Sequence, residues 1–190
     1  MEPRVSATLI LDQIRLIKDA HGEAIVVEAF ASLPAVVRQE LDELLPGRWC
    51  STDAVRMMKQ AIADRLGEPL LSFQRRTVRL GVERTLNTFW RFFMRHLSDD
   101  ALVQRTPILY SRTFDRGELR FISVADRQAL LELHGWPTIP EFNLVGLSAG
   151  IEAVLALAGR VEPHVATSRR GVVVHFLCEW KAKQKQAAGH

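Results

Sequence analysis

The reactive side chains of this sequence are not arranged in the spacings of familiar catalytic or metal sites. Two cysteines, Cys50 and Cys178, and six histidines are spread over 190 residues. The sequence contains no His-Glu-x-x-His zinc motif, no Cys-x-x-Cys pair and no glycine-rich phosphate loop ending in Lys-Ser or Lys-Thr. A metal cage needs several converging ligands, which two isolated cysteines cannot supply. The sequence therefore predicts no catalytic residues, no metal site and no bound cofactor, and we expect that the chain is not an enzyme.

The cysteines indicate a cellular compartment rather than a reaction. Val172, Val174, Phe176, Cys178 and Trp180 alternate with a second set of side chains, as in a strand that has one buried face. On that face Cys178 is expected to be a small buried hydrophobic residue. Two cysteines are also too few for the disulfide framework of a secreted domain. We therefore expect a reducing compartment, the cytoplasm.

The densest aromatic group of the chain consists of Phe89, Trp90, Phe92 and Phe93. Phe89 and Phe93 are four residues apart and share one helix face, which core packing explains. Trp90 and Phe92 point partly away from that face, so they need a second surface to cover them. Three alternatives stay open for this group: core packing, a subunit interface, or the wall of a ligand cavity.

The helix predicted over residues 70–97, which contains this aromatic group, is rich in arginine. Glu68 and Glu83 partly oppose its positive charge. Its arginines are Arg75, Arg76, Arg79, Arg84, Arg91 and Arg95. Nucleic-acid binders usually combine such charge with a recognisable module or with exposed stacking aromatics, and the aromatics here are expected to be buried. A solvated helix face is therefore the favoured interpretation, and no nucleic-acid partner is expected.

The elements that must position these residues are helical in the first half of the chain. Apolar spacing predicts helices over residues 8–20, 23–31, 34–44, 52–66, 70–97 and 99–109. Ser51 or Thr52 is expected to cap the fourth helix, and Pro107 to disturb the last one. The helix over 70–97 is expected to be central and buried, with Gly81 as its weak point.

The second half reads as strand, strand, helix, strand, strand. The strands are predicted over residues 119–124, 128–134, 161–165 and 172–180. The helix between the two hairpins is predicted over 140–158, because Pro140 suits a first turn and Gly159 a position just past the end. Gly146, Gly150 and Ala153 form a seam of small residues on this helix, which we expect to face the sheet.

Length and composition favour one soluble domain over residues 1–190. The helical part is expected over about 8–109, the sheet with its packing helix over about 118–180, and a basic tail over 181–190. The net charge is +3 and the mean hydropathy is zero. Three lysines lie in the final ten residues, so the body is close to neutral. No stretch approaches the ~20 apolar residues of a membrane span.

Several segments together resemble a family of uncharacterised bacterial proteins of about 200 residues, which myxobacterial genomes carry as many paralogues. The segments are Ala31-Ser-Leu-Pro-Ala-Val-Val-Arg38, Leu44-Leu-Pro-Gly-Arg-Trp49, Ile62-Ala-Asp-Arg-Leu-Gly67 and Thr106-Pro-Ile-Leu-Tyr-Ser-Arg-Thr-Phe-Asp-Arg-Gly117. The helix from Phe142 and the hairpin that ends at Trp180 are similar to a fold shared by haem-nitric-oxide-binding domains, V4R small-molecule-binding domains and TRAPP trafficking subunits. This similarity implies an α+β fold, in which a helical layer packs on a four-stranded antiparallel sheet. Relatives use it to enclose an apolar ligand or to pair subunits.

The resemblance raises the question of haem. Only His96 and His134 are expected beside a cavity wall, and both have a plain structural interpretation, at a helix end and a strand end. The sensors hold the haem propionates with a Tyr-x-Ser-x-Arg pattern, and Tyr110-Ser111-Arg112 has the wrong spacing. Haem binding is therefore the less favoured interpretation.

The expected function is that of a non-catalytic regulatory or protein-interaction module with a small apolar ligand between helices and sheet. The alternative is a structural adaptor subunit of a homodimer or a larger assembly. A protein partner or a homodimer is expected in either case, and a haem-based gas sensor or an enzyme is less favoured. The candidate ligand-binding or interface residues are Phe89, Trp90, Phe92, Phe93, His96, Tyr110, His134 and Trp136.

Overall fold

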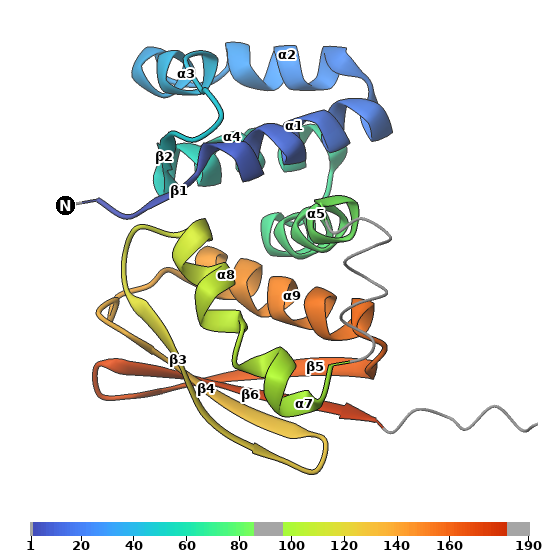
Figure 1. The fold of residues 1–190 in the computed structure, drawn as a ribbon. Coiled ribbons are helices and arrows are strands. Elements are labelled where there is room, and N and C mark those ends of the chain that lie inside the picture. Colours follow the sequence, from blue (N-terminus) through green and yellow to red (C-terminus); the bar gives the residue numbers. More distant parts are fainter. Residues whose placement is uncertain (1, 86–96, 182–190) are drawn as a thin grey trace, which may run out of the picture.

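A four-stranded antiparallel sheet carries the described helices on one of its faces (Figure 1). The structure is a computed structural model that describes residues 2–85 and 97–181. The strands are β3 (Glu118–Ala125), β4 (Gln128–His134), β5 (Val161–Arg170) and β6 (Val173–Lys181), in the order β3-β4-β6-β5. The predicted α+β class is confirmed, with four strands at the positions that the sequence indicates.

The inner face of the sheet is apolar because the side chains of a strand alternate between its two faces. Leu131 of β4 pairs with Phe176 of β6, and both side chains are fully buried. Cys178 is buried beside them, as predicted. Val172 is an exception among the predicted core residues: it lies in the turn before β6 and is 68% exposed.

The inner face is covered by α9 (Glu141–Leu157), the helix predicted over 140–158. Pro140 is its N-cap residue, and Gly159 follows its end with a φ of 83°. This left-handed conformation is one that glycine adopts without a steric cost. The α9 helix lies between the sheet and a helix of the first half, α5 (Leu70–Thr85), so it is buried on both sides (Figure 1).

The seam of small residues on α9 faces α5 rather than the sheet, which corrects the expected orientation. A Cβ atom placed on Gly146 would clash with Gln74 Nε2, and one placed on Gly150 would meet Val78 Cγ1 at 3.7 Å. Both neighbours belong to α5. The side chains that α9 turns to the sheet are large, because Leu147, Ile151 and Leu155 belong to the apolar cluster on the sheet's inner face.

Gly146→Ala is expected to lower the unfolding free energy by about 1–2 kcal/mol, because the new methyl group must displace the buried Gln74 amide. Gly150→Ala is the matched control. Its methyl group makes only an ordinary contact with Val78, and alanine is about 1 kcal/mol better than glycine inside a helix. Urea unfolding of both variants tests this difference. Equal stabilities would contradict the close approach of α5 at Gly146.

The remaining helices of the first half are close to their predicted ranges. They are α1 (Ala7–His21), α2 (Glu23–Ala31), α3 (Ala35–Asp42) and α4 (Thr52–Leu66). Ser51 is the N-cap residue of α4, since its hydroxyl accepts hydrogen bonds from the backbone N–H groups of Asp53 and Ala54. These helices and α5 enclose a second apolar cluster, and Phe114 packs against both clusters.

Three details depart from the predicted elements. Arg4–Ser6 (β1) and Trp49–Ser51 (β2) form a small antiparallel sheet that three-residue strands are too short to reveal by alternation. The segment predicted as one helix over 99–109 is two helices, α7 (Asp99–Val103) and α8 (Thr106–Thr113). Pro107 lies in the first turn of α8, where a missing N–H is tolerated, so it starts a helix rather than disturbing one.

The helix predicted over 70–97 is described as α5 up to Thr85 only. Residues 86–96, which include Phe89, Trp90, Phe92, Phe93 and His96, lie outside the described part of the chain. The tail after residue 181 also lies outside it. Among the helices of the described residues, none has the length and apolar character needed to cross a membrane.

Candidate functional site

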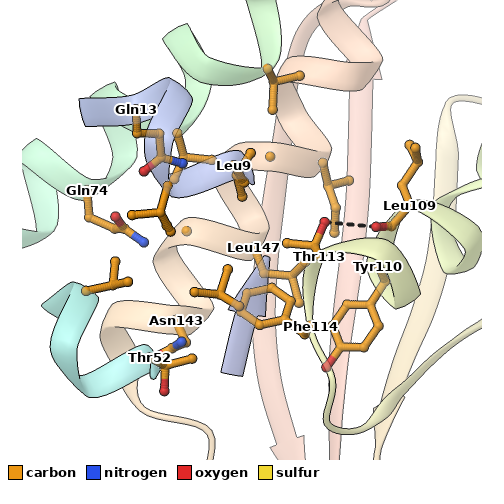
Figure 2. A pocket seen from close by; sticks show the side chains of 18 of the residues that line it. Leu9, Gln13, Thr52, Gln74, Leu109, Tyr110, Thr113, Phe114, Asn143 and Leu147 are labelled. Atoms are coloured by element: carbon orange, nitrogen blue, oxygen red, sulfur yellow. Dashed lines mark hydrogen bonds between the residues drawn. The ribbon is translucent and has the colours of Figure 1, made fainter. Parts of the chain in front are cut away.

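A cavity of about 240 Å³ lies where the helices of the first half meet α8 and α9. Side chains of α1, α4 and α5 line one side, and side chains of α8 and α9 line the other. The cavity therefore lies between the two apolar clusters of the protein. Figure 2 shows Gln13 and Gln74 on one side of it, and Leu109, Tyr110 and Thr113 on the opposite side.

Most of the lining is apolar, and aliphatic side chains contribute the largest share. The side chains that form it include Leu9, Val78, Val82, Leu147, Ile151 and Val154. Among the described lining residues, only Lys59 and Arg112 carry a formal charge, and none is an aspartate or a glutamate. An apolar cavity with a few polar groups is typical of small-molecule sites.

The polar groups gather on the side formed by α1, α4 and α5. Lys59 of α4 is fully buried, and its Nζ lies 2.5 Å from Gln74 Oε1 and 2.9 Å from Thr77 Oγ1. Gln74 also donates through Nε2 to the carbonyl of Phe142 at 3.4 Å, which ties α5 to α9. Burial lowers the pKa of Lys59 to about 7. The Lys59 amine therefore changes its charge near neutral pH, inside a cavity whose lining is mostly apolar.

Gln13 of α1 adds a second polar group to the same cavity lining. Its side chain is only 2% exposed, and its Oε1 atom has no hydrogen-bond partner among the described residues. Buried polar atoms are normally paired, so an unpaired amide oxygen in a cavity is an available acceptor for a ligand.

The sequence analysis did not single out Lys59 or Gln13, although the sequence holds a signal for both. Gln13 is three residues after Ile10 and four before Ile17, so it lies on the apolar stripe of α1. Lys59 is four residues after Val55 and three before Ile62, on the apolar stripe of α4. A polar residue on a buried stripe must find a partner or contact a cavity.

Of the predicted site residues in the described chain, Tyr110 and Trp136 belong to one apolar cluster and both pack against Phe114, whereas the side chain of His134 lies apart from them. Tyr110 lines the cavity, and its hydroxyl donates to the carbonyl of Arg116 at 2.5 Å. Trp136 is buried in the sheet-side core, where it meets Phe114 edge to face. His134 lies on the outer face of the sheet, because its neighbour Leu133 points inward. The role of these residues in ligand binding stays a prediction.

His134 is paired on that outer face with Glu132, at 2.9 Å between His134 Nε2 and Glu132 Oε2. His175 Nδ1 approaches the other carboxylate oxygen of Glu132 at 3.7 Å. Within residues 2–85 and 97–181 no group of three or more histidine, cysteine or acidic side chains is placed to hold a metal ion.

Three of the four arginines of α5 form ion pairs within the chain. Arg75 forms an ion pair with the buried Glu152 of α9, Arg76 pairs with Glu68, and Arg84 pairs with Asp19. These pairs neutralise part of the basic bias that the sequence shows on this helix. The expectation of a solvated helix face without a nucleic-acid partner stays a prediction.

The expectation that no catalytic spacing occurs was wrong in one place, because Gly146-Leu147-Ser148-Ala149-Gly150 has the Gly-x-Ser-x-Gly spacing of acyl-transfer enzymes. In such enzymes the serine lies on a sharp turn between a strand and a helix, which exposes its hydroxyl. Here Ser148 lies in the middle of α9 and is only 4% exposed. The motif is therefore part of a packed helix, and the geometry of a nucleophile elbow is missing at Ser148.

The described lining does not fit haem iron. Haem proteins hold the metal with histidine, cysteine, methionine or tyrosine. The described lining residues include no histidine, cysteine or methionine, and Tyr110 donates its hydroxyl hydrogen to a backbone carbonyl. Burial raises the pKa of Tyr110, which disfavours the phenolate that iron would need. His96 lies outside the described residues.

No protein-family model and no curated protein sequence matches the chain. The resemblance to the myxobacterial paralogues therefore has no support from these comparisons.

Solved structures do match, and they agree on one fold. An H-NOX protein from K. algicida in the Fe(II) unliganded state superposes with a TM-score of 0.68 at 6% identity, covering 93% of this chain and 97% of that one. An oxygen-binding H-NOX domain related to soluble guanylate cyclases gives 0.62 at 14% identity, covering 97% and 100%. At such identities the likeness establishes the fold alone, and this chain has the fold of H-NOX domains over nearly its whole length.

Proposed function

We propose that this chain is a non-catalytic ligand-sensing module that encloses a small apolar molecule in the cavity between its two apolar clusters. The cavity itself carries the proposal. It is lined by aliphatic side chains from both apolar clusters, and its volume of about 240 Å³ lies just below the ~300–1,000 Å³ of sites for drug-sized ligands. A ligand of this site is therefore smaller than a typical drug molecule.

The position of the cavity supports a regulatory role. A molecule held there contacts α1, α4 and α5 on one side and α8 and α9 on the other. Such a ligand favours the arrangement of these two groups of helices that gives it the better contacts. Its differential affinity for the two arrangements shifts the population toward the favoured one. The oxygen complex of an H-NOX neighbour is a precedent for a small molecule bound within this fold.

An adaptor subunit of a homodimer or larger assembly is the second candidate function. It depends on Trp90 and Phe92, which lie outside the described residues. We expect this adaptor to have an empty interior, whereas the sensing module carries its ligand. Native mass spectrometry of the protein purified from its own host separates the two: a bound small apolar molecule supports the sensor, and a stoichiometric protein complex without one supports the adaptor.

Val82→Phe is expected to remove most of the stabilisation that octanol, used as a neutral apolar probe, gives to the wild type. At about 100 times its Kd a ligand stabilises the folded state by about 2.7 kcal/mol. The phenyl ring of the new residue at position 82 is larger than the valine side chain and fills part of the cavity, which leaves less space for octanol. Thermal unfolding with and without octanol measures the difference.

Val36→Phe is the matched control, because Val36 lies on α3, is 74% exposed and does not line the cavity. It should keep the full octanol effect. If Val82→Phe and Val36→Phe respond to octanol alike, the probe binds elsewhere and the cavity is not the site.

A further inference from the structure

Lys59 is a buried amine whose two partners are both uncharged. Gln74 Oε1 can only accept a hydrogen bond, and Thr77 donates its own hydroxyl hydrogen to the carbonyl of Phe73 at 2.8 Å. Two acceptors satisfy the two N–H groups of a neutral amine, but an ammonium has a third N–H. In the described chain no carboxylate lies within ion-pairing distance of Lys59 Nζ.

The cavity that Lys59 lines is poor in negative charge. Its described lining holds two cationic side chains, Lys59 and Arg112, and no acidic one. The structure also leaves Gln13 Oε1 buried and unpaired in the same lining. A carboxylate oxygen can only accept a hydrogen bond, so Gln13 would bind it through its Nε2 hydrogens, after a rotation of the amide that exchanges the positions of Nε2 and Oε1.

We infer that the ligand of this cavity is a small monocarboxylate with an apolar body, whose carboxylate pairs with the Lys59 ammonium and hydrogen-bonds to Gln13. This inference rests on the proposed function. The carboxylate supplies the counter-charge and the acceptor for the third N–H that the chain itself lacks at Lys59. The apolar body packs against aliphatic side chains such as Val78, Val82 and Val154.

When such a carboxylate binds above neutral pH, the Lys59 amine must take up a proton. The pKa of Lys59 is lowered to about 7 by burial, so at pH 8.5 its amine is mostly neutral in the free protein. A bound carboxylate favours the ammonium, as an opposite charge does at any nearby titratable group. Binding of octanoate at pH 8.5 is therefore expected to take up about one proton, and its affinity to fall about tenfold per pH unit between pH 7.5 and 8.5.

Isothermal titration calorimetry of octanoate and octanol, in two buffers that differ in ionisation enthalpy, tests the inference on the whole chain. For the wild type at pH 8.5, octanoate should show the proton uptake and octanol should show none. In Lys59→Met, octanoate should bind at least about tenfold more weakly at pH 7 and lose the proton uptake, while octanol should keep its affinity. Lys18→Met, a change on the surface of α1, should behave like the wild type.

The outcomes separate this inference from the proposed function. If octanol and octanoate bind equally well and without proton uptake, the carboxylate site is wrong and the apolar cavity stands. If Lys59→Met keeps the proton uptake, another group is the partner and the assignment of Lys59 is overturned. If neither probe binds to the wild type, the proposed function itself is contradicted. If Lys59→Met does not fold, the wild type still decides the question below pH 7: the affinity for octanoate should level off there because Lys59 is already charged, whereas binding of the neutral acid would keep strengthening down to the pKa of the ligand's own carboxyl group.

Discussion

The unfolding free energy of the wild-type protein is expected to rise by about 2 kcal/mol between pH 7 and pH 8.5, and this rise should vanish in Lys59→Met. The cause is the burial of Lys59, which lowers the pKa of its amine from 10.5 to about 7 in the folded state. Below pH 7 the amine is charged in both states, and the folded state bears the full cost of burying that charge.

Above pH 7 the unfolded chain still holds the Lys59 proton while the folded protein has released it. Stability rises with pH wherever the unfolded state binds more protons, by about 1.4 kcal/mol per pH unit for one group. The gain would continue up to the unfolded pKa of 10.5 if no other group intervened.

Two buried thiols set the upper limit of the pH range in which the effect of Lys59 can be measured. Burial raises the pKa of Cys50 and of Cys178 from 9.0 to about 12, so above pH 9 the unfolded state releases thiol protons that the folded state keeps. That difference lowers stability with rising pH and opposes the effect of Lys59. Urea unfolding between pH 7 and 8.5 isolates the lysine.

Lys59→Met keeps a long apolar side chain in place and removes the titrating group. Lys18→Met is the control, because Lys18 is a half-buried surface residue that pairs with the exposed Glu23. The control should retain the slope of the wild type. A flat profile in the wild type would contradict a neutral, buried Lys59.

Arg75→Met is the second change with a large expected effect, a loss of about 1–3 kcal/mol in unfolding free energy, because a buried carboxylate loses its nearest donor. Arg75 is the cation that pairs with Glu152, a carboxylate that is only 2% exposed. Glu152 Oε1 also accepts a hydrogen bond from the backbone N–H of Val165 at 3.0 Å. The carboxylate therefore links α9 to α5 and to the edge strand β5, and without Arg75 it is left buried without its nearest cation.

Arg79→Met on the same helix is the matched control, because Arg79 is exposed and surface changes usually stay within about 0.5 kcal/mol. Glu152→Gln in the Arg75→Met background should recover part of the loss, since the amide needs no cation and its oxygen still accepts from Val165. Guanidinium unfolding of the variants measures these values. Equal losses for Arg75→Met and Arg79→Met would show that the ion pair does not support the packing of α5 on α9.

The fold was predictable from the sequence where nearby residues determine the ends of a helix or strand. The α9 helix was predicted within one residue at each end, because Pro140 and Gly159 bound a continuous apolar run. The strands followed from alternation, although β5 runs five residues further than predicted, to Arg170. An edge strand of this kind is lengthened by its pairing with β6, which is a tertiary interaction.

The candidate site was not predictable in the same way. The cavity depends on how α5 approaches α9, and the seam of small residues indicates a close neighbour without saying which one. Lys59 and Gln74 are fifteen residues apart, on two different helices, so no pattern within one helix shows their contact. The predicted aromatic group itself lies outside the described residues, and the part of the site that depends on it stays a prediction.

Methyl NMR of the wild-type protein during a titration with octanol tests the central claim most directly. If the cavity encloses an apolar ligand, the methyl signals of Val78, Val82 and Val154 should shift together and saturate, because these side chains line it. The methyl signals of Val27 and Val36, which are 57% and 74% exposed, should stay in place. Saturable shifts at the exposed valines, with none at the three cavity valines, would contradict the claim that this chain binds an apolar molecule in the cavity between its two apolar clusters.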